Sequence, residues 1–398
     1  MCGEIRGLWL MVPCLAALAA WPLMAAEEKK EPADAPAAEK TNQEKPTEEK
    51  PSGEKTTEEK TSEEKKEEEK VDPFIVPEGT PEELVEYIDK VRKTPLENPQ
   101  MVVKARRALR RAAEHIIAAQ PEEKQMTHAV QLKMQLLGDQ EQLAGFAEEL
   151  KEDGHEKYAR MVRNFGLQIE LAKTERQDPR NQKKAIGDVL RFLEESPPEQ
   201  ADSGLALMAG KMAELTGDNQ YASEVYRSAA KAFAAGKDEK LAEFARTLAG
   251  TSRRLALLGN EIRIEGRLLD GGTFDWSKYA GKVVLVDFWS TWSGSSVADL
   301  SKMKKYYDRY HDKGFDIVGI SCDQRLADLE KFVKKRDIPW AIVYGKDKPS
   351  PSVAYYGVTD IPTKILVGRD GKVMLLNARG LKLKEELLKL FGPAEKKK

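Results

Sequence analysis

Cysteine is scarce in this sequence, with three residues among 398. Two of them, Cys2 and Cys14, lie in or next to the apolar N-terminal segment, which we expect to be a targeting signal. A mature chain without that segment keeps only Cys322, and a single thiol cannot form an intrachain disulfide. The composition therefore excludes a small domain held together by disulfides and a catalytic pair of cysteines in the mature chain.

Histidine and the common ligand-binding motifs are also scarce. His115, His128 and His155 are scattered through a region of helical pattern without the spacing of metal ligands, and His311 is the only other histidine. The sequence has no phosphate-binding loop, zinc-finger pattern or dinucleotide fingerprint. A net charge of −2 gives no reason to expect nucleic-acid binding. We therefore predict no metal, no cofactor and no nucleic acid as ligands.

The N-terminal segment predicts export. An apolar run from Leu8 to Ala26 follows Arg6 and is succeeded directly by charged residues, which is the pattern of a signal peptide over residues 1–26. The run is also long enough to act as an uncleaved anchor, so both alternatives stay open. We expect a location in a bacterial periplasm or at the cell surface, with membrane contact only through this segment if it is retained.

A charged tract and a helical region follow. Residues 27–72 are rich in Glu, Lys, Thr and Pro and nearly free of apolar side chains, which predicts a disordered linker. Residues 73–258 place apolar side chains at helical spacing between short polar breaks. Ala222, Tyr226 and Ala229 have the spacing found in the second helix of a tetratricopeptide repeat. We predict an all-α domain of stacked helix pairs, TPR-like in arrangement.

From residue 259 the pattern changes to alternating strands and helices. Two apolar runs, Val283 to Trp289 and Phe315 to Ile320, flank a stretch of helical spacing. This order predicts a parallel β-α-β unit whose crossover brings the carboxyl ends of both strands to one edge of the sheet. Further strands are expected over residues 261–266, 273–275, 340–344, 364–367 and 373–376. We assign an α/β domain to residues 259–392, and residues 393–398 to a basic tail.

The segment from Val286 to Ser296, Val-Asp-Phe-Trp-Ser-Thr-Trp-Ser-Gly-Ser-Ser, joins the first of these strands to the following helix. It resembles the active-site turn of the TlpA-like thiol:disulfide oxidoreductases, which are close to the redoxins, with serine in place of both cysteines of the C-x-x-C motif. A second motif, Asp360-Ile361-Pro362-Thr363, resembles the family's loop in which the proline is cis and faces this turn. The resemblance covers residues 259–392 and implies a thioredoxin-like fold.

The two serines cannot perform the family's chemistry. A hydroxyl forms no disulfide and does not ionise near neutral pH, so we interpret Ser293 and Ser296 as helix-capping or surface hydroxyls. By the resemblance, Asp287 stands at the place of a buried acid that assists proton transfer to the cysteines. Without thiols we expect it to be an orphan acid kept by a bond to water or backbone. Ser293 also lacks a base, because His311 lies eighteen residues further along the expected helix, roughly 27 Å away.

Three functions remain open. In the first, the chain is a pseudoenzyme that has lost dithiol chemistry and binds an extended peptide or a periplasmic protein partner. The resemblance places this binding groove at Trp292, Gly294, Ile361 and Pro362. In the second, the chain is a single-thiol oxidoreductase or peroxidase that uses Cys322. In the third, the helical repeats are the working scaffold and the thioredoxin-like domain is structural.

The thiol of Cys322 separates the first two functions. Cys322 ends the second parallel strand, so we expect it at the same sheet edge as Ser293. A buried and inert core thiol is the competing interpretation, since the sequence gives no sign of exposure or of a lowered pKa.

Overall fold

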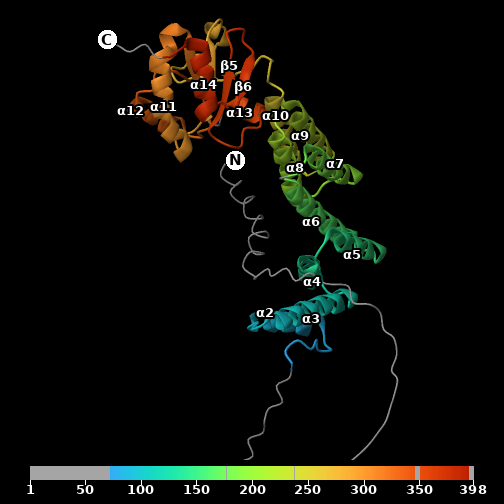
Figure 1. Cartoon of the computed structure of the whole chain (residues 1–398). Coiled ribbons are helices and arrows are strands. Elements are labelled where there is room, and N and C mark those ends of the chain that lie inside the picture. The colour runs from blue at the N-terminus through green and yellow to red at the C-terminus, as the bar shows by residue number, and fades with distance from the viewer. Residues whose placement is uncertain (1–71, 176, 237, 346–349, 394–398) are drawn as a thin grey trace, which may run out of the picture. The chain divides into compact units, whose positions relative to one another are not determined.

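A computed structural model describes residues 72–175, 177–236, 238–345 and 350–393 of the chain (Figure 1). The expected signal segment, all of the expected linker except its last residue, and residues 394–398 of the basic tail lie outside these residues. Among the helices that are described, none is both long enough and apolar enough to cross a membrane.

The first part of the described chain is helical, as predicted (Figure 1). Its helices are α2 (Pro81–Lys93), α3 (Pro99–Ala118), α4 (Glu123–Leu136), α5 (Gln140–Glu152), α6 (Glu156–Thr174), α7 (Pro179–Glu195), α8 (Ser203–Leu215), α9 (Asn219–Ala234) and α10 (Glu239–Leu255), with a 3-10 turn η3 (Gln200–Asp202) before α8. Six of them begin with a polar side chain that accepts a hydrogen bond from an amide of the first turn. Most of these helices pack on the next one along the chain, and α4 packs on α6, α6 on α8 and α7 on α9 as well.

Small residues set the spacing of these helices. Ala222, Tyr226 and Ala229, which the sequence placed on one helix face, are all buried in the core formed by α6 to α10. A Cβ atom on Gly210 would lie 2.4 Å from ring atoms of Tyr226. Glycine at this position of α8 therefore lets the Tyr226 ring of α9 pack directly against the helix backbone.

The second part is built on a mixed six-stranded sheet. Its strands are β1 (Arg267–Leu268), β2 (Val283–Trp289), β3 (Phe315–Ser321), β4 (Ala341–Tyr344), β5 (Thr363–Val367) and β6 (Val373–Leu376), in the order β1-β4-β3-β2-β5-β6. β2, β3 and β4 are parallel, whereas β1, β5 and β6 pair antiparallel. The helix α11 (Gly294–Tyr310) connects β2 to β3, which confirms the predicted parallel β-α-β unit.

Alternate side chains of β2 enter two separate cores. Val283, Leu285 and Trp289 face a layer that includes residues of α11, α12 (Leu326–Arg336) and α14 (Gly380–Phe391). Val284, Val286 and Phe288 face the other layer, which includes α13 (Pro351–Tyr355) and the 3-10 turn η4 (Trp276–Tyr279). A second 3-10 turn, η5 (His311–Lys313), links α11 to β3. Because both faces are covered, all seven residues of β2 are buried.

The strands expected over residues 261–266 and 273–275 are not formed, and the second segment has only an isolated bridge between Thr273 and Arg267. In the first of these segments Ile262 and Ile264 are buried, and Glu261 forms an isolated bridge with Lys372, but the next backbone amides bond to side chains. Arg263 N donates to Tyr356 Oη at 2.8 Å, and Glu265 N donates to Ser352 Oγ at 2.9 Å. Hydroxyl groups from a distant part of the sequence thus satisfy polar backbone atoms that a strand partner would have paired.

The last helix of the helical region contacts the α/β domain near the loop that leads to Pro362. Thr251 Oγ1 donates to Gly357 O at 3.2 Å. A Cβ atom on Gly250 would lie 2.4 Å from Gly357 N, so the two backbones approach at a pair of glycines. In the same area, an ion pair of 3.4 Å joins Lys211 to Asp360.

Candidate functional site

The turn between β2 and α11 carries the serines that the sequence singled out. Ser293 is the N-cap of α11, and its Oγ accepts a hydrogen bond from Ser296 N at 3.3 Å, which confirms the capping interpretation for this residue. Ser293 Oγ also lies 3.1 Å from Ser295 Oγ, and Ser295 Oγ donates to Ile361 O at 3.4 Å. The hydroxyls of Ser293 and Ser295 therefore connect the start of α11 to the loop before β5.

Ser296 is not a surface hydroxyl. It is 3% exposed, and its Oγ has no hydrogen-bond partner among the described residues. The same holds for the fully buried Ser290 Oγ and for Trp289 Nε1. Buried polar atoms without partners cost free energy, so their gathering at one turn marks a place where stability alone does not explain the sequence.

The four residues expected to form a binding groove lie around one edge of the sheet. Trp292 is 62% exposed, Gly294 is exposed, Ile361 is half-buried and Pro362 is buried. β5 pairs with β2 so that Thr363 stands opposite Phe288, which brings the loop of Ile361 and Pro362 beside the turn. The peptide bond between these two residues is cis, as the resemblance implied. We call this set, Trp292, Gly294, Ile361 and Pro362, the turn–loop edge.

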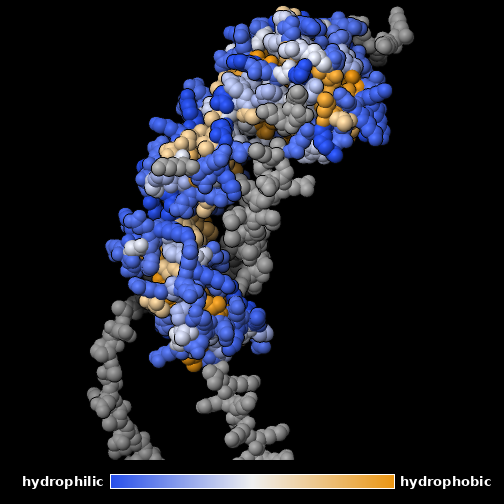
Figure 2. All heavy atoms as spheres, turned by 180° about the vertical axis from the view of Figure 1, so that it is seen from behind, coloured by the Kyte–Doolittle hydropathy of each residue, from blue (hydrophilic) through white to orange (hydrophobic). Residues whose placement is uncertain are grey.

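The indole of Trp292 is one of few large hydrophobic side chains that are exposed in the described part of the chain. The face of the molecule in Figure 2 is mainly hydrophilic, with small hydrophobic patches. Large hydrophobic side chains that are exposed in the described part of the chain are few: Ile75, Val103, Leu215, Leu258, Trp292, Tyr355, Met374 and Leu381. An exposed tryptophan beside a backbone edge can supply contact area to a partner.

Asp287 is not an orphan acid held by water or backbone, as the sequence suggested. Its Oδ1 forms an ion pair of 3.2 Å with Nζ of Lys364, which also donates to Asp299 Oδ2 at 3.2 Å. Asp287 and Lys364 are 4% and 0% exposed. Burial raises the pKa of Asp287, and the ammonium of Lys364 partly offsets that rise. A lysine within the apolar run of β5, two residues after Pro362, was the available signal for this pair, but its partner lies in another strand.

Like Lys364, Asp323 has a role at this site that the sequence pattern did not predict. Its carboxylate accepts from Thr291 N at 3.1 Å and from Thr291 Oγ1 at 2.6 Å, while its own amide donates to Ser321 Oγ at 3.0 Å. The turn after β2 is thus held by the turn after β3. The signal was present, because both turns follow parallel strands whose ends share one edge of the sheet.

Cys322 follows β3 at this edge, and its amide donates to Trp289 O at 2.8 Å. The thiol is 4% exposed and packs in the layer with Phe288 and Tyr356, whereas α11 covers the opposite face of the sheet. The geometry favours the buried, inert interpretation of this cysteine.

The histidine of the α/β domain lies away from the serines. His311 caps the far end of α11, where it stacks on Tyr307 with ring centroids 4.3 Å apart. Within the ranges that the structure describes, no group of three or more His, Cys, Asp and Glu side chains could hold a metal ion.

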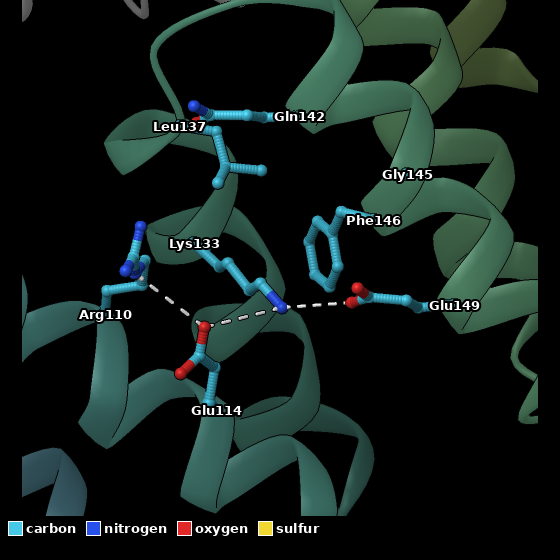
Figure 3. A pocket seen from close by; sticks show the side chains of 8 residues that line it. All are labelled: Arg110, Glu114, Lys133, Leu137, Gln142, Gly145, Phe146 and Glu149. Carbon is cyan, nitrogen blue, oxygen red and sulfur yellow. Dashed lines mark hydrogen bonds and ion pairs between the residues drawn. The ribbon is translucent and has the colours of Figure 1, made fainter. Parts of the chain in front are cut away.

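A separate cavity of about 380 Å³ lies between α3, α4 and α5 in the helical region (Figure 3). Lys133 reaches into it and pairs with Glu149 at 3.2 Å and with Glu114 at 3.7 Å, while its ammonium lies 4.1 Å from the centre of the Phe146 ring. Arg110 pairs with Glu114 at 3.8 Å. The charges around this cavity are satisfied by one another.

Comparison with known proteins identifies thioredoxin-like relatives. A thioredoxin-like family model matches residues 281–373. ResA, a thiol-disulfide oxidoreductase of Bacillus thuringiensis subsp. konkukian, is 30% identical over 119 residues, which are 30% of this chain and 67% of ResA. ResA of Halalkalibacterium halodurans is 25% identical over 127 residues, 31% of this chain and 71% of that protein.

Solved structures of thiol-disulfide oxidoreductases are also similar to about a third of this chain. The thioredoxin domain of a thiol-disulfide oxidoreductase from Bacteroides vulgatus is 28% identical, with a TM-score of 0.31, and the match covers 33% of this chain and 96% of that one. A thiol:disulfide interchange protein from Bacteroides sp. is also 28% identical with a TM-score of 0.31, over 35% of this chain and 93% of that one. Through its α/β domain, the chain belongs to the ResA- and TlpA-like family of thiol-disulfide oxidoreductases with a thioredoxin fold.

Proposed function

We propose that this protein is an exported thioredoxin-fold protein that has lost dithiol–disulfide exchange and binds an extended segment of a peptide or protein partner at the turn–loop edge. The observation that carries the proposal is the pair of serines, Ser293 and Ser296, in the first turn of α11, beside the exposed indole of Trp292. The two thiols needed for redox exchange are missing there, but the four residues of the turn–loop edge are present around the turn.

The loss of redox chemistry rests on the side chains at the start of α11. A helix N-terminus can stabilise a thiolate, but a serine hydroxyl neither ionises near neutral pH nor forms a disulfide. Cys322 does not replace the missing thiols, because it is buried on the opposite face of the sheet from α11. The alternative of a single-thiol oxidoreductase or peroxidase is therefore not favoured.

The binding role rests on the exposed indole and on the adjacent backbone. Trp292 offers a large amphipathic contact surface, and the backbone of Ile361 lies at the start of β5, where an extended segment can add to the edge. Since Pro362 is buried, we assign the pairing to the Ile361 backbone and the apolar contact to Trp292. A partner must displace the weak bond of 3.4 Å between Ser295 Oγ and Ile361 O.

The cellular location belongs to the proposal. The apolar run from Leu8 to Ala26 supports export to a bacterial periplasm or the cell surface, with the segment either cleaved or kept as an anchor. A working role of the helical scaffold gains no support from the cavity between α3, α4 and α5, whose charged groups are already paired.

A trapping experiment tests the binding role. In the full chain with Cys2→Ser and Cys14→Ser, Ser293→Cys places one thiol at the turn–loop edge. A cysteine-containing extended peptide, activated as a mixed disulfide with thionitrobenzoate, is compared with dithiobis-nitrobenzoate, which has no peptide. The ratio of the two rates cancels the intrinsic reactivity of the thiol, so an excess for the peptide measures binding.

The matched control is Ser301→Cys, on an exposed part of the same helix. We expect the ratio of the peptide rate to the dithiobis-nitrobenzoate rate to be about tenfold higher for Ser293→Cys than for Ser301→Cys. A tenfold difference corresponds to roughly 1.4 kcal/mol of binding free energy. Equal ratios at the two positions would contradict a peptide-binding edge.

A further inference from the structure

We infer that Lys364 is a positioning residue for the turn–loop edge: its buried ammonium joins the three elements that carry the two halves of this edge, so that partner binding depends on a side chain that the partner does not touch. The inference rests on the proposed function. It concerns a residue that neither the sequence motifs nor the resemblance brought forward.

The ammonium lies at the meeting point of β2, β5 and α11. Nζ of Lys364, on β5, is 3.2 Å from Asp287 Oδ1 on β2 and 3.2 Å from Asp299 Oδ2 on α11. β2 runs into the turn that contains Trp292, and α11 starts at Gly294. β5 begins directly after Pro362. One side chain therefore fixes both the turn and the loop relative to each other.

Burial shields the ion pair between Lys364 and Asp287 from water. Lys364 is 0% exposed and Asp287 is 4% exposed, so water does not compete for their contact. The Asp299 side chain is 29% exposed, which leaves it the only member of the three with access to solvent. Removal of the ammonium takes away the shared partner of Asp287 and Asp299, so the bonds that hold β5 and α11 to β2 at this point are lost.

The opposite end of β2 provides a natural comparison. There Lys282 pairs with Asp316 at 2.8 Å, but the Lys282 side chain is 37% exposed. This pair lies at the start of β2 and β3, away from the turn–loop edge. Its removal tests the effect of losing an ion pair in the same domain without loosening the proposed binding surface.

The experiment uses the Ser293→Cys trap in the full chain with Cys2→Ser and Cys14→Ser. Adding Lys364→Met should lower the ratio of the peptide rate to the dithiobis-nitrobenzoate rate by about tenfold. Adding Lys282→Met should leave that ratio within about twofold of the parent. A general loosening of the domain changes both reagents alike, whereas a misplaced edge changes the peptide alone.

A second variant guards against loss of folding. Asp299→Asn removes the charge of the least buried member and should lower the ratio in the same direction. Slow amide exchange in β6, outside the ion network, verifies that each variant is folded. A folded Lys364→Met or Asp299→Asn chain that keeps the parent's ratio overturns the inference and leaves the proposed function standing. A parent trap without any preference for the peptide contradicts the proposed function, and the inference with it.

Discussion

Two buried carboxylates, one in each part of the molecule, differ sharply in how they are satisfied. Asp202, in the helical region, accepts from Arg160 Nη2 at 2.7 Å, Arg160 Nε at 3.0 Å, Asn164 Nδ2 at 2.7 Å and the Glu199 amide at 2.8 Å. Asp287, in the α/β domain, has an ion pair of 3.2 Å with Lys364, but its Oδ1 lacks a contact of hydrogen-bond geometry.

The difference separates structural from functional burial. Asp202 is fully bonded and links α6 to the start of α8, so its burial is explained by stability. Asp287 lies beneath a turn with three further buried polar atoms that have no partner in the described chain. Such under-bonded groups persist where a constraint other than stability acts on the sequence.

The largest effect is expected from breaking the well-bonded network. Asp202→Ala leaves the Arg160 guanidinium and the Asn164 amide without their acceptor, and we expect a loss of about 3 kcal/mol in the free energy of unfolding. Asp188→Ala, which removes an exposed ion pair with Arg191, is the control and should cost little. Chemical denaturation of both variants measures the difference. A loss below that of the control would show that Asp202 is not a structural anchor.

A smaller effect is expected at the turn, where satisfied and unsatisfied hydroxyls lie three residues apart. Ser293→Ala removes the N-cap of α11 and should cost about 1 kcal/mol. Ser296→Ala removes a buried hydroxyl without a partner and should leave stability unchanged or raise it. Thermal and chemical unfolding compare the two variants. Equal losses would refute the distinction between them.

The smallest effect, and one that depends on pH, is expected at Asp287. Burial is the main cause that raises the pKa of Asp287, Asp299 adds to the rise, and Lys364 and Arg379 oppose it. The folded state therefore keeps a proton that the unfolded state has lost, and wild-type stability falls as the pH rises from the ordinary value of 3.8 towards the raised pKa.

Asp287→Asn removes this dependence. The variant should resemble the wild type at low pH and should match or exceed its stability by about 1 kcal/mol near neutral pH. Denaturation at a series of pH values gives the difference. A loss of several kcal/mol at neutral pH would show that the ionised carboxylate is a structural necessity, like Asp202.

The sequence predicted what local pattern and strand order determine. Val283 to Trp289 and Phe315 to Ile320 are apolar runs of strand length, and the helical spacing between them predicts a parallel unit without any knowledge of distant contacts. Asp287 could be singled out from the sequence because it is an acid within one of these apolar runs. The strand over residues 261–266 failed because hydroxyl groups of Ser350, Ser352 and Tyr356, distant in sequence, bond to this segment's backbone.

The site was predictable only in part. The capping role of Ser293 follows from its place at a helix start, but the burial of Ser296 depends on packing that no motif shows. The partner of Asp287 lies in β5, which pairs with β2 antiparallel across a separation of more than seventy residues. The register of that pairing is set by the whole sheet, so neither Lys364 nor Asp299 can be assigned to Asp287 from the sequence.

We infer that this thioredoxin-fold chain lacks dithiol chemistry because serines stand at positions 293 and 296 at the start of α11. Reduction of insulin disulfides by dithiothreitol, followed by turbidity, tests it with the wild type and with Ser293→Cys combined with Ser296→Cys. We expect background rates for the wild type, and for the double variant a reversible disulfide between the two introduced thiols with a rate above background. Wild-type rates like those of an ordinary thioredoxin, or a folded double variant with two free and unperturbed thiols, would contradict the account.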